Sequence, residues 1–280
     1  MDEWLKQNRS EYALMIRVIN QFLAQSFFPV PTAPAQSGHY REDHTQSILE
    51  LLSSFPESHL NLPLKVFSLG PVYDPGHGRW AETVDVEILG EGGPQHELMA
   101  VQLIMQLIEQ WPRLAEKTVM VMGHLGLLDQ AMAAEAVLPV VRHSVRDALR
   151  AGNLVQAESL LAPTSPKTRR LLLPKTYDDF VRALQDTLPE ADFDHIARLQ
   201  NAIDQHMATR WDLSLTGNWP YYTDLVFSLY LKDIGQPLLN GGRFMADVHG
   251  RTWHGVGFTL YLDSLYQAVQ QEMEQESHDL

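Results

Sequence analysis

Residues 83–89 read Thr83-Val84-Asp85-Val86-Glu87-Ile88-Leu89, and this stretch decides the class of fold. Apolar Val84, Val86 and Ile88 alternate with polar Thr83, Asp85 and Glu87. Such a period of two predicts a β-strand with one apolar and one polar face. A second strand is predicted over residues 65–73, and Gly76-His77-Gly78 predicts a turn between the two.

Outward from these strands the pattern mixes helices and strands without strict alternation. Helices are predicted over residues 10–25, 45–53, 96–111 and 127–151, the last broken near Pro139. Further strands are predicted at 118–122 and within 213–230, with a tight turn at Gly241-Gly242 and a final helix over 257–274. Pro-rich residues 26–38 predict an extended segment and a loop, and residues 152–207 a helical insertion or subdomain. This mixture favours an α+β fold with a largely antiparallel sheet.

Composition sets the limits of function. The chain has 280 residues, 21 Lys and Arg against 35 Asp and Glu (21 − 35 = −14), and no Cys. A net charge of −14 disfavours nucleic-acid binding, although it does not exclude a local basic patch. The lack of Cys excludes disulfides, thiolate nucleophiles and Cys-ligated metal. No apolar run is long enough to span a membrane and the first residues lack a signal-peptide pattern, so we expect a cytoplasmic protein that binds no membrane.

Short catalytic and metal-binding motifs are missing. The sequence contains no P-loop, no His-Glu-x-x-His zinc motif and no Gly-x-Ser-x-Gly nucleophile elbow. His39 and His44 are five residues apart, as are His249 and His254, and neither pair has the helical spacing of a zinc site. Gly255-Val256-Gly257 is interpreted as a plain turn before a helix. We therefore expect no metal and no cofactor.

Four segments in a fixed order carry a family resemblance. They are Arg41-Glu42-Asp43-His44-Thr45; Gly70-Pro71-Val72-Tyr73 with Val86-Glu87-Ile88-Leu89-Gly90; Met122-Gly123-His124-Leu125-Gly126; and Tyr221-Tyr222-Thr223-Asp224-Leu225-Val226-Phe227 with Gly241-Gly242-Arg243-Phe244 and Val256-Gly257-Phe258-Thr259-Leu260. Together they resemble the histidyl branch of class II aminoacyl-tRNA synthetases. Within that branch the chain is most similar to regulatory subunits of short-form ATP phosphoribosyltransferase. The resemblance implies one class II synthetase-like domain over residues 1–280, an antiparallel sheet flanked by helices.

The resemblance also implies a histidine-binding site. Asp43 and Thr45 match residues that hold the amino group of histidine, and Glu87 matches the carboxylate that meets its imidazole. Tyr221 and Tyr222 match tyrosines that contact the imidazole. A carboxylate and a hydroxyl suit an ammonium, and a second carboxylate suits an imidazole N–H.

Each residue also has a purely structural interpretation. Glu87 can be a solvated residue on the polar face of its strand, and Asp43 with Thr45 can cap a helix N-terminus. Because neighbouring residues of a strand face opposite ways, only one of Tyr221 and Tyr222 is expected to line the pocket, and Tyr222 is the preferred choice.

Departures from the family pattern argue against a synthetase. Where class II enzymes carry the motif 2 arginine that binds ATP, this chain continues from Val72 with Tyr73-Asp74-Pro75, and Ser264 stands at the place of the motif 3 arginine. Serine lacks the guanidinium fork that suits phosphate. Thr83 replaces a motif 2 glutamine, and Gly217-Asn218-Trp219-Pro220 replaces Arg-Gly-Leu-Asp, which leaves the pocket's ligand open. No anticodon-binding domain is expected.

The function that the resemblance implies is that of a non-catalytic regulatory subunit with no catalytic residue. It would join a catalytic ATP phosphoribosyltransferase subunit in a hetero-octamer, self-associate as a dimer, activate the enzyme and transmit histidine feedback in the first step of histidine biosynthesis. Two alternatives stay open: a minimal synthetase paralogue that forms an aminoacyl-adenylate, and a stand-alone amino-acid sensor.

Overall fold

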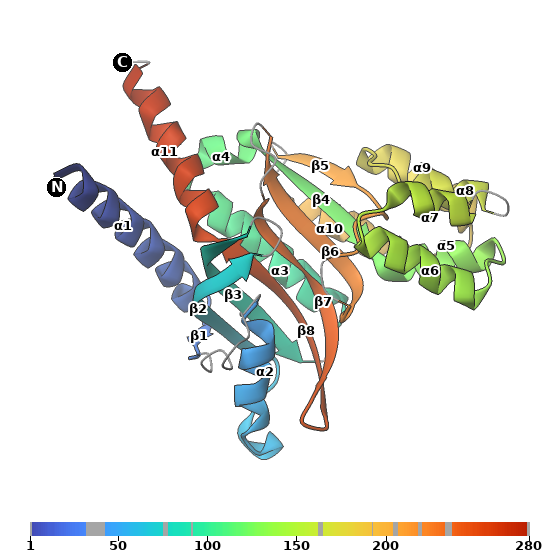
Figure 1. Ribbon diagram of the computed structural model, residues 1–280, viewed down its shortest axis with the longest axis horizontal. Helices are drawn as coiled ribbons and strands as arrows, with labels where there is room; N and C mark the ends of the chain where they lie inside the picture. Colours follow the sequence, from blue (N-terminus) through green and yellow to red (C-terminus); the bar gives the residue numbers. More distant parts are fainter. Residues whose placement is uncertain are drawn as a thin grey trace.

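A single mixed β-sheet of eight strands organises the chain (Figure 1). The computed structural model describes residues 2–31, 43–74, 78–90, 92–161, 165–191, 193–203, 207–217, 220–232 and 237–278. The strands are β1 (Phe28–Pro29), β2 (Leu64–Asp74), β3 (Arg79–Gly90), β4 (Thr118–His124), β5 (Ala208–Trp211), β6 (Tyr222–Leu231), β7 (Pro237–Val248) and β8 (Arg251–Tyr261). Their order is β1-β2-β3-β8-β7-β6-β4-β5. Among the strands of the described residues, only the two outer pairs, β1–β2 and β4–β5, are parallel, so the sheet is largely antiparallel, as predicted.

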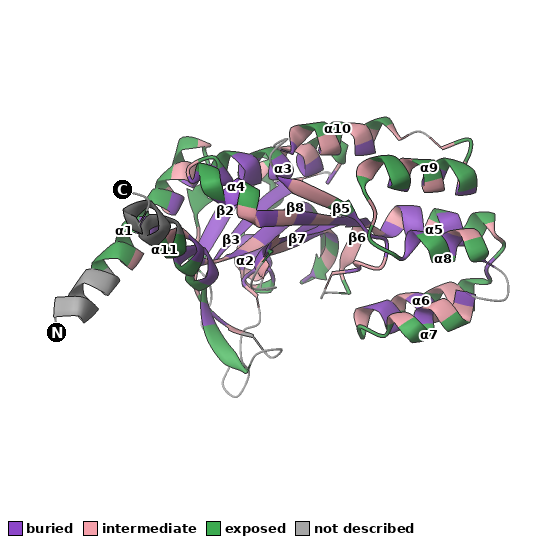
Figure 2. Cartoon of the chain, turned by 90° about the horizontal axis from the view of Figure 1, so that it is seen from above, coloured by how far each residue is buried: buried purple, intermediate pink, exposed green. Residues whose placement is uncertain are grey.

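Helices cover both faces and one end of this sheet (Figures 1 and 2). They are α1 (Asp2–Ala24), α2 (Thr45–Ser53), α3 (Pro94–Ile108), α4 (Pro112–Lys117), α5 (Leu125–Ala134), α6 (Pro139–Arg150), α7 (Leu154–Leu161), α8 (Pro166–Leu171), α9 (Tyr177–Thr187), α10 (Asp194–Ala202) and α11 (Leu262–His278), with a 3-10 turn η1 at Glu57–His59. Among these described helices, none combines the length and apolar composition that crossing a bilayer requires.

The two faces of β3 separate two hydrophobic clusters. Val84, Val86 and Ile88 pack into the larger cluster together with α3, which contacts β8 and is itself covered by α10. On the opposite face, Ile48 and Leu49 of α2 belong to a smaller cluster. Figure 2 shows α3 and α10 on one side of the sheet and α2 on the other. The polar face of β3 therefore points toward α2 and is buried, which decides against a solvated strand face.

Several predicted elements are confirmed closely. Helix α2 matches residues 45–53, β2 contains residues 65–73, and α5 and α6 divide just before Pro139. The region 152–207 is helical from α7 to α10, and α5 to α9 form a block at one end of the sheet (Figure 1). Its status as an insertion stays a prediction. His39, residues 76–77 and most of the 26–38 loop lie outside the described residues.

Two predictions at the C-terminal end are wrong. Gly241-Gly242 is not a turn but the middle of β7, and Gly257 lies within β8 rather than at the start of a helix, which begins at Leu262. Gly255-Val256-Gly257 is likewise strand. The physical reason is crowding: a Cβ on Gly241 would lie 2.3 Å from Gly257 O, and one on Gly242 would lie 2.6 Å from Leu225 O. These glycines permit close approach within a sheet, a second use of glycine besides turns.

Candidate functional site

A small buried cavity lies between α2 and the sheet, and all five residues predicted from the sequence line it. They are Asp43, Thr45, Glu87, Tyr221 and Tyr222. The remaining lining residues come from the neighbouring strands β7 and β8: Phe244, Gly257, Phe258 and Thr259. The antiparallel pairing of β3 with β8 sets Glu87 opposite Gly257, which brings distant segments of the sequence to one point.

The first turn of α2 is joined to β3 by a buried hydrogen bond. Thr45 Oγ1 donates to Glu87 Oε1 at 2.6 Å. Within the described residues, Glu87 Oε2 has no hydrogen-bond partner. The N-cap residue of α2 is His44, whose side chain makes no cap hydrogen bond, while Asp43 Oδ1 accepts from the Gln46 N–H at 3.4 Å. The Thr45 hydroxyl therefore bonds to a cavity residue instead of capping the helix. Of the two residues, only Asp43 makes a capping hydrogen bond, and that bond is weak.

Both tyrosines line the cavity, so the expectation that only one would do so is wrong. Tyr221 comes just before the first residue of β6, where strict alternation does not yet apply. Its hydroxyl donates to Asp43 Oδ2 at 2.7 Å, and its ring meets that of Tyr222 edge-on at 5.3 Å between centroids. Gly217 leaves space for Tyr222, because a Cβ at Gly217 would lie 2.4 Å from Tyr222 Cδ2.

The Glu87 carboxylate occupies the space that a side chain at position 257 would fill. A Cβ on Gly257 would lie 1.9 Å from Glu87 Oε2. Real Cβ atoms do not approach an oxygen so closely, so the position of this carboxylate depends on glycine at the paired position of β8.

Burial dominates the electrostatics of the cavity. It raises the pKa of Glu87 well above its usual value; the Thr45 hydrogen bond opposes this, and the charges of Asp85 and Asp43 add to it. Burial also raises the pKa of Asp43, against the hydrogen bond from Tyr221. None of the described lining residues is Lys, Arg or His. Carboxylates gathered without a counter-charge favour a cationic ligand, because a cation would remove their mutual repulsion.

The cavity is closed in this structure. Its volume is about 10 Å³, roughly what a single water needs. An amino acid can enter only if the surrounding side chains move, and the Tyr221–Asp43 hydrogen bond joins two of the side chains that line the cavity.

Sequence reasoning did not select Asp85 as a site residue. Asp85 is buried two residues before Glu87, on the same face of β3. It accepts hydrogen bonds from Thr259 at 2.6 Å and from Thr83 at 3.0 Å. The alternation of residues 83–89 contained the signal, because residues two apart in a strand share a face. Thr83, at the place of the family's glutamine, thus supports a second carboxylate.

Two of the positions that depart from the family pattern, Tyr73 and Ser264, lie in β2 and α11. Ser264 is buried in α11, and Tyr73 packs edge-on against Trp80 with 5.6 Å between ring centroids. In the described residues, no group of three His, Asp or Glu side chains is placed to hold a metal ion.

A separate ionic cluster lies away from the cavity and ties α10 to the sheet. The buried Glu97 carboxylate of α3 is hydrogen-bonded to the His195 ring of α10. Arg243 Nη1 of β7 lies 3.7 Å from Glu97 Oε1. The same Arg243 nitrogen lies 3.1 Å from Asp224 Oδ2. Arg243, part of the motif that suggested the family, is therefore used in packing rather than in the cavity.

Comparisons with known proteins agree with this architecture. Residues 40–265 match the family model of histidyl-tRNA synthetase. A regulatory subunit of ATP phosphoribosyltransferase from Thermus thermophilus is 26% identical over 256 residues, covering 84% of this chain and 69% of the relative. One from Halalkalibacterium halodurans is 23% identical over 290 residues, covering 96% and 72%.

Solved structures share the fold at low sequence identity. A crystal structure described as an ATP phosphoribosyltransferase regulatory subunit/histidyl-tRNA synthetase from Bacillus halodurans superposes with a TM-score of 0.77 at 18% identity, covering 96% of this chain and 80% of the other. A chain of an ATP phosphoribosyltransferase complex from Thermotoga maritima gives a TM-score of 0.63 at 16% identity, covering 90% and 97%. The predicted class II synthetase-like fold is confirmed.

Proposed function

The chain belongs to the histidyl-tRNA synthetase family, and from that premise we propose that it is a non-catalytic regulatory subunit of ATP phosphoribosyltransferase. The relatives that carry this name support the role. Likeness to a chain of the Thermotoga maritima complex supports a catalytic subunit as its partner in a hetero-oligomer. One observation carries the proposal furthest: a buried acidic cavity is present, while Tyr73 and Ser264 stand where a synthetase would hold ATP.

The proposed effector of the cavity is histidine. Its ammonium group would pair with Asp43 and Thr45, and its imidazole N–H would donate to Glu87, whose Oε2 has no partner within the described residues. Both contacts are charge-assisted hydrogen bonds, the stronger kind. The half-buried Tyr221 and Tyr222 would complete the wall around the ring. This is the class of ligand that a cavity with carboxylates and no basic lining residue selects.

Regulation would follow from the closed state of the cavity. The ammonium group of histidine would compete with the Tyr221 hydroxyl for Asp43, and the side chains around the cavity would have to move apart to admit it. A ligand that binds only the open form of the cavity increases the population of molecules in that form. Any part of the protein whose structure differs between the open and closed forms changes with it. Coupling between such sites is about 1–3 kcal/mol in typical allosteric proteins.

We further propose, on the family resemblance, a cytoplasmic hetero-octamer in which this chain self-associates as a dimer. Light scattering of the isolated chain and of the mixture with the catalytic subunit measures both masses. A monomeric chain, or a complex of another stoichiometry, would contradict this part of the proposal and leave the regulatory role standing.

The deciding experiment measures phosphoribosyltransferase activity of a short-form catalytic subunit, alone and with this chain, with and without histidine. We expect activation by the chain and its reversal by histidine. Glu87→Ala should weaken the histidine response and leave activation intact. Glu82→Ala is the matched control, because Glu82 lies on the same strand but is exposed and outside the cavity.

Three other outcomes have distinct meanings. Loss of activation with retained histidine sensitivity in Glu87→Ala would contradict the role given to Glu87. Histidine-dependent exchange between ATP and pyrophosphate would support an adenylate-forming synthetase paralogue. Histidine binding without any effect on the catalytic subunit would support a stand-alone sensor.

A further inference from the structure

A basic hollow lies in the helical block, away from the acidic cavity. Three cationic side chains line it, Arg170 of α8, Arg210 of β5 and Lys175 between α8 and α9, together with one carboxylate, Asp179; its other lining residues are uncharged. Its volume is about 520 Å³, within the range of roughly 300–1,000 Å³ typical of small-molecule sites.

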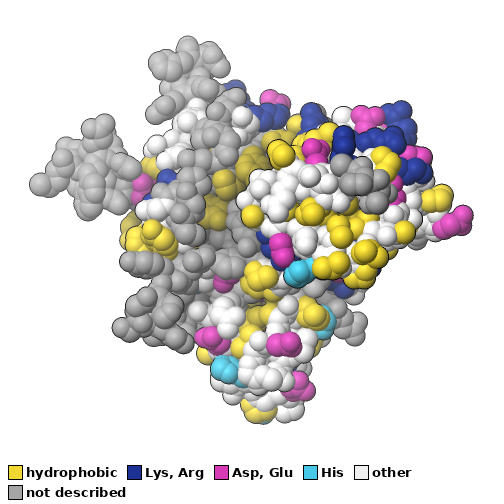
Figure 3. All heavy atoms as spheres, turned by 45° about the vertical axis from the view of Figure 1, so that its right-hand side comes forward, with side chains coloured by type: hydrophobic (Ala, Val, Ile, Leu, Met, Phe, Trp, Pro, Cys, Tyr) yellow, Lys and Arg dark blue, Asp and Glu magenta, His cyan; other side chains and the backbone are white. Residues whose placement is uncertain are grey.

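Local charge around the hollow opposes the charge of the whole chain. Residues 165–175 contain Lys167, Arg169, Arg170 and Lys175 and no acidic residue, in a chain of net charge −14. Figure 3 shows Lys and Arg side chains gathered at the upper right of the molecule, on the side where Figure 1 places α8 and α9. Such a local reversal of sign attracts anions that the rest of the surface repels.

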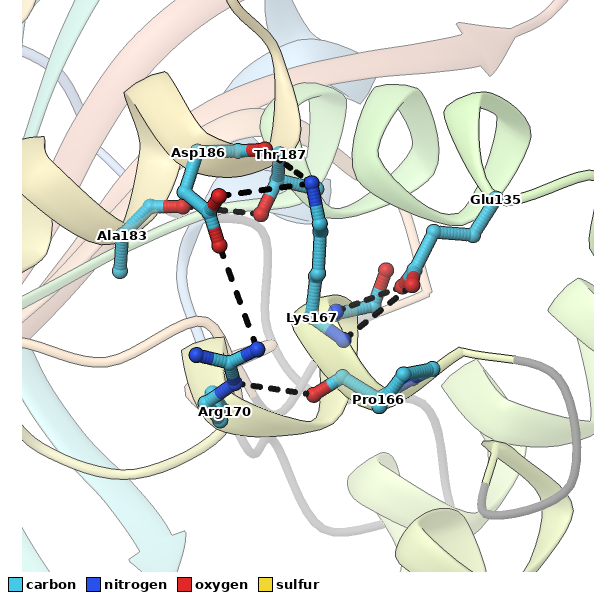
Figure 4. A network of polar contacts seen from close by, with 8 residues as sticks. Glu135, Pro166, Lys167, Arg170, Ala183, Asp186 and Thr187 are labelled. Atoms are coloured by element: carbon cyan, nitrogen blue, oxygen red, sulfur yellow. Dashed lines mark hydrogen bonds and ion pairs between the residues drawn. The ribbon is translucent and has the colours of Figure 1, made fainter.

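Nearby carboxylates leave most of this positive charge uncompensated. Asp179 pairs with Arg182 and accepts from the Thr176 hydroxyl at 2.9 Å. Asp186 is occupied by Lys167 at 3.4 Å and lies 4.0 Å from Arg170 Nη2, as Figure 4 shows. Within the described residues, neither Lys175 nor Arg210 forms an ion pair, although the Lys175 charge does act on Asp212. Two cationic heads are therefore available to a ligand.

The wall that presents these cations is held in place by other contacts. The Glu135 carboxylate accepts from the backbone N–H groups of Lys167 and Thr168 at 3.2 and 2.7 Å, and so fixes the first turn of α8 (Figure 4). Lys175 and Trp211 exchange backbone hydrogen bonds of 2.9 Å, which joins the segment before α9 to the end of β5 beside Arg210. Hydrogen bonds therefore fix the backbone segments that carry the cationic residues.

From the convergence of these three cations on one hollow, we propose that it binds a small anion carrying several phosphate groups. Guanidinium groups donate in pairs to phosphate oxygens, and an ammonium supplies a point charge beside them. A single carboxylate suits the site less, because it would leave one of the two cations that are unpaired in the described residues, Lys175 and Arg210, without a partner. The site is independent of the proposed function, and its test uses the isolated chain.

The test is calorimetric titration of the isolated full-length chain with tripolyphosphate at low salt. We expect saturable binding at one site, weakened at least tenfold in Lys175→Glu/Arg210→Glu. The neutral variant Lys175→Gln/Arg210→Gln should lose less, and it serves if the charge reversal does not fold. Arg198→Glu is the matched control, because Arg198 is exposed on α10 and does not line the hollow. Thermal melting without ligand verifies that each variant is folded.

A comparison of two ligands shows whether the hollow recognises an inorganic polyphosphate or the phosphate chain of a nucleotide. Equal affinity for tripolyphosphate and a nucleoside triphosphate would assign recognition to the phosphate chain alone, whereas tighter binding of the nucleotide would add a base contact; both support the site. Absence of saturation in the millimolar range, or equal loss in Arg198→Glu, would overturn it. Weaker binding of the catalytic subunit to the double variant, without polyphosphate binding, would also overturn it in favour of a protein docking surface.

Discussion

The Thr45 hydroxyl donates to Glu87 Oε1 at 2.6 Å, and this bond alone links the described first turn of α2 to the carboxylate in the cavity. Thr45 lies on the first turn of a helix and Glu87 on a central strand, 42 residues apart. The bond fixes one oxygen of the carboxylate, and the other, Oε2, lies beside Gly257 without a hydrogen-bond partner in the described residues.

Removal of this donor should destabilise the protein while a hydroxyl-preserving change should not. Thr45→Val keeps the shape of the side chain but leaves a buried carboxylate without its hydrogen bond, which costs about 1–3 kcal/mol. Thr45→Ser retains the donor and serves as the control. Urea denaturation at neutral pH measures both. Equal stability of the two variants would show that the bond contributes nothing.

The raised pKa of Glu87 predicts a particular dependence of stability on pH. The folded state binds this proton more tightly than the unfolded chain, so its stabilising contribution is complete below the usual glutamate pKa of 4.5 and is lost as pH rises through the raised value. Each unit of pKa difference corresponds to about 1.4 kcal/mol.

Glu87→Gln should therefore be more stable than the parent chain at pH 8, and the difference should shrink as pH falls toward 4.5. Thermal melting across this range measures it. A difference that is constant with pH would indicate that Glu87 does not carry a raised pKa. Glu109→Gln, at an exposed position directly after α3, is the control.

Sequence patterns predicted local structure well and failed where tertiary packing decides; the five predicted residues that line the cavity came from the family resemblance, and their role as ligands stays a prediction. The alternation in residues 83–89 predicts the strand and its polar face, but only the packing of α2 on the sheet buries that face. Gly241 and Gly257 were assigned to a turn and a helix start because glycine favours both. The need for them is a clash across neighbouring strands, which no local pattern reveals. Likewise, Tyr221 enters the cavity because it precedes the strand, a boundary that sequence fixes only approximately.

Gly257→Ala should disturb the cavity directly. The new methyl would lie 1.9 Å from Glu87 Oε2, so the carboxylate or the strand must shift. Overpacking of this kind costs about 1–3 kcal/mol, and we expect histidine binding to be lost in calorimetric titration. At Gly93 the atom nearest to a new Cβ is the end of the exposed Gln95 side chain, which can move aside. Gly93→Ala is thus the matched control, and equal losses in both variants would contradict the role of Gly257.

Glu97 should stabilise the folded protein through its contacts with His195 and Arg243, on the face of the sheet opposite the cavity. Glu97→Gln would remove the carboxylate beside the His195 ring, while Arg243 keeps Asp224 at 3.1 Å, so we expect the loss of a hydrogen bond to a charged group, about 1.5–3 kcal/mol. Asp147→Asn breaks exposed pairs with His143 and Arg150, for which we expect about 0–1 kcal/mol. Hydrogen exchange should show α10 loosened in the first variant only. Unchanged protection of α10 would mean that it is held by apolar contacts alone.

The contact between Tyr221 and Asp43 can be isolated with a double-mutant cycle. Tyr221→Phe removes the hydroxyl that donates to Asp43 Oδ2 at 2.7 Å, and Asp43→Ala removes the acceptor. A hydrogen bond to a charged group contributes about 1.5–3 kcal/mol, so the double variant should lose less stability than the sum of the single ones by that amount. Because this bond joins two residues that line the closed cavity, Tyr221→Phe should also bind histidine faster, which stopped-flow fluorescence measures. Additive losses together with an unchanged association rate would mean that the bond neither stabilises the closed cavity nor limits entry to it.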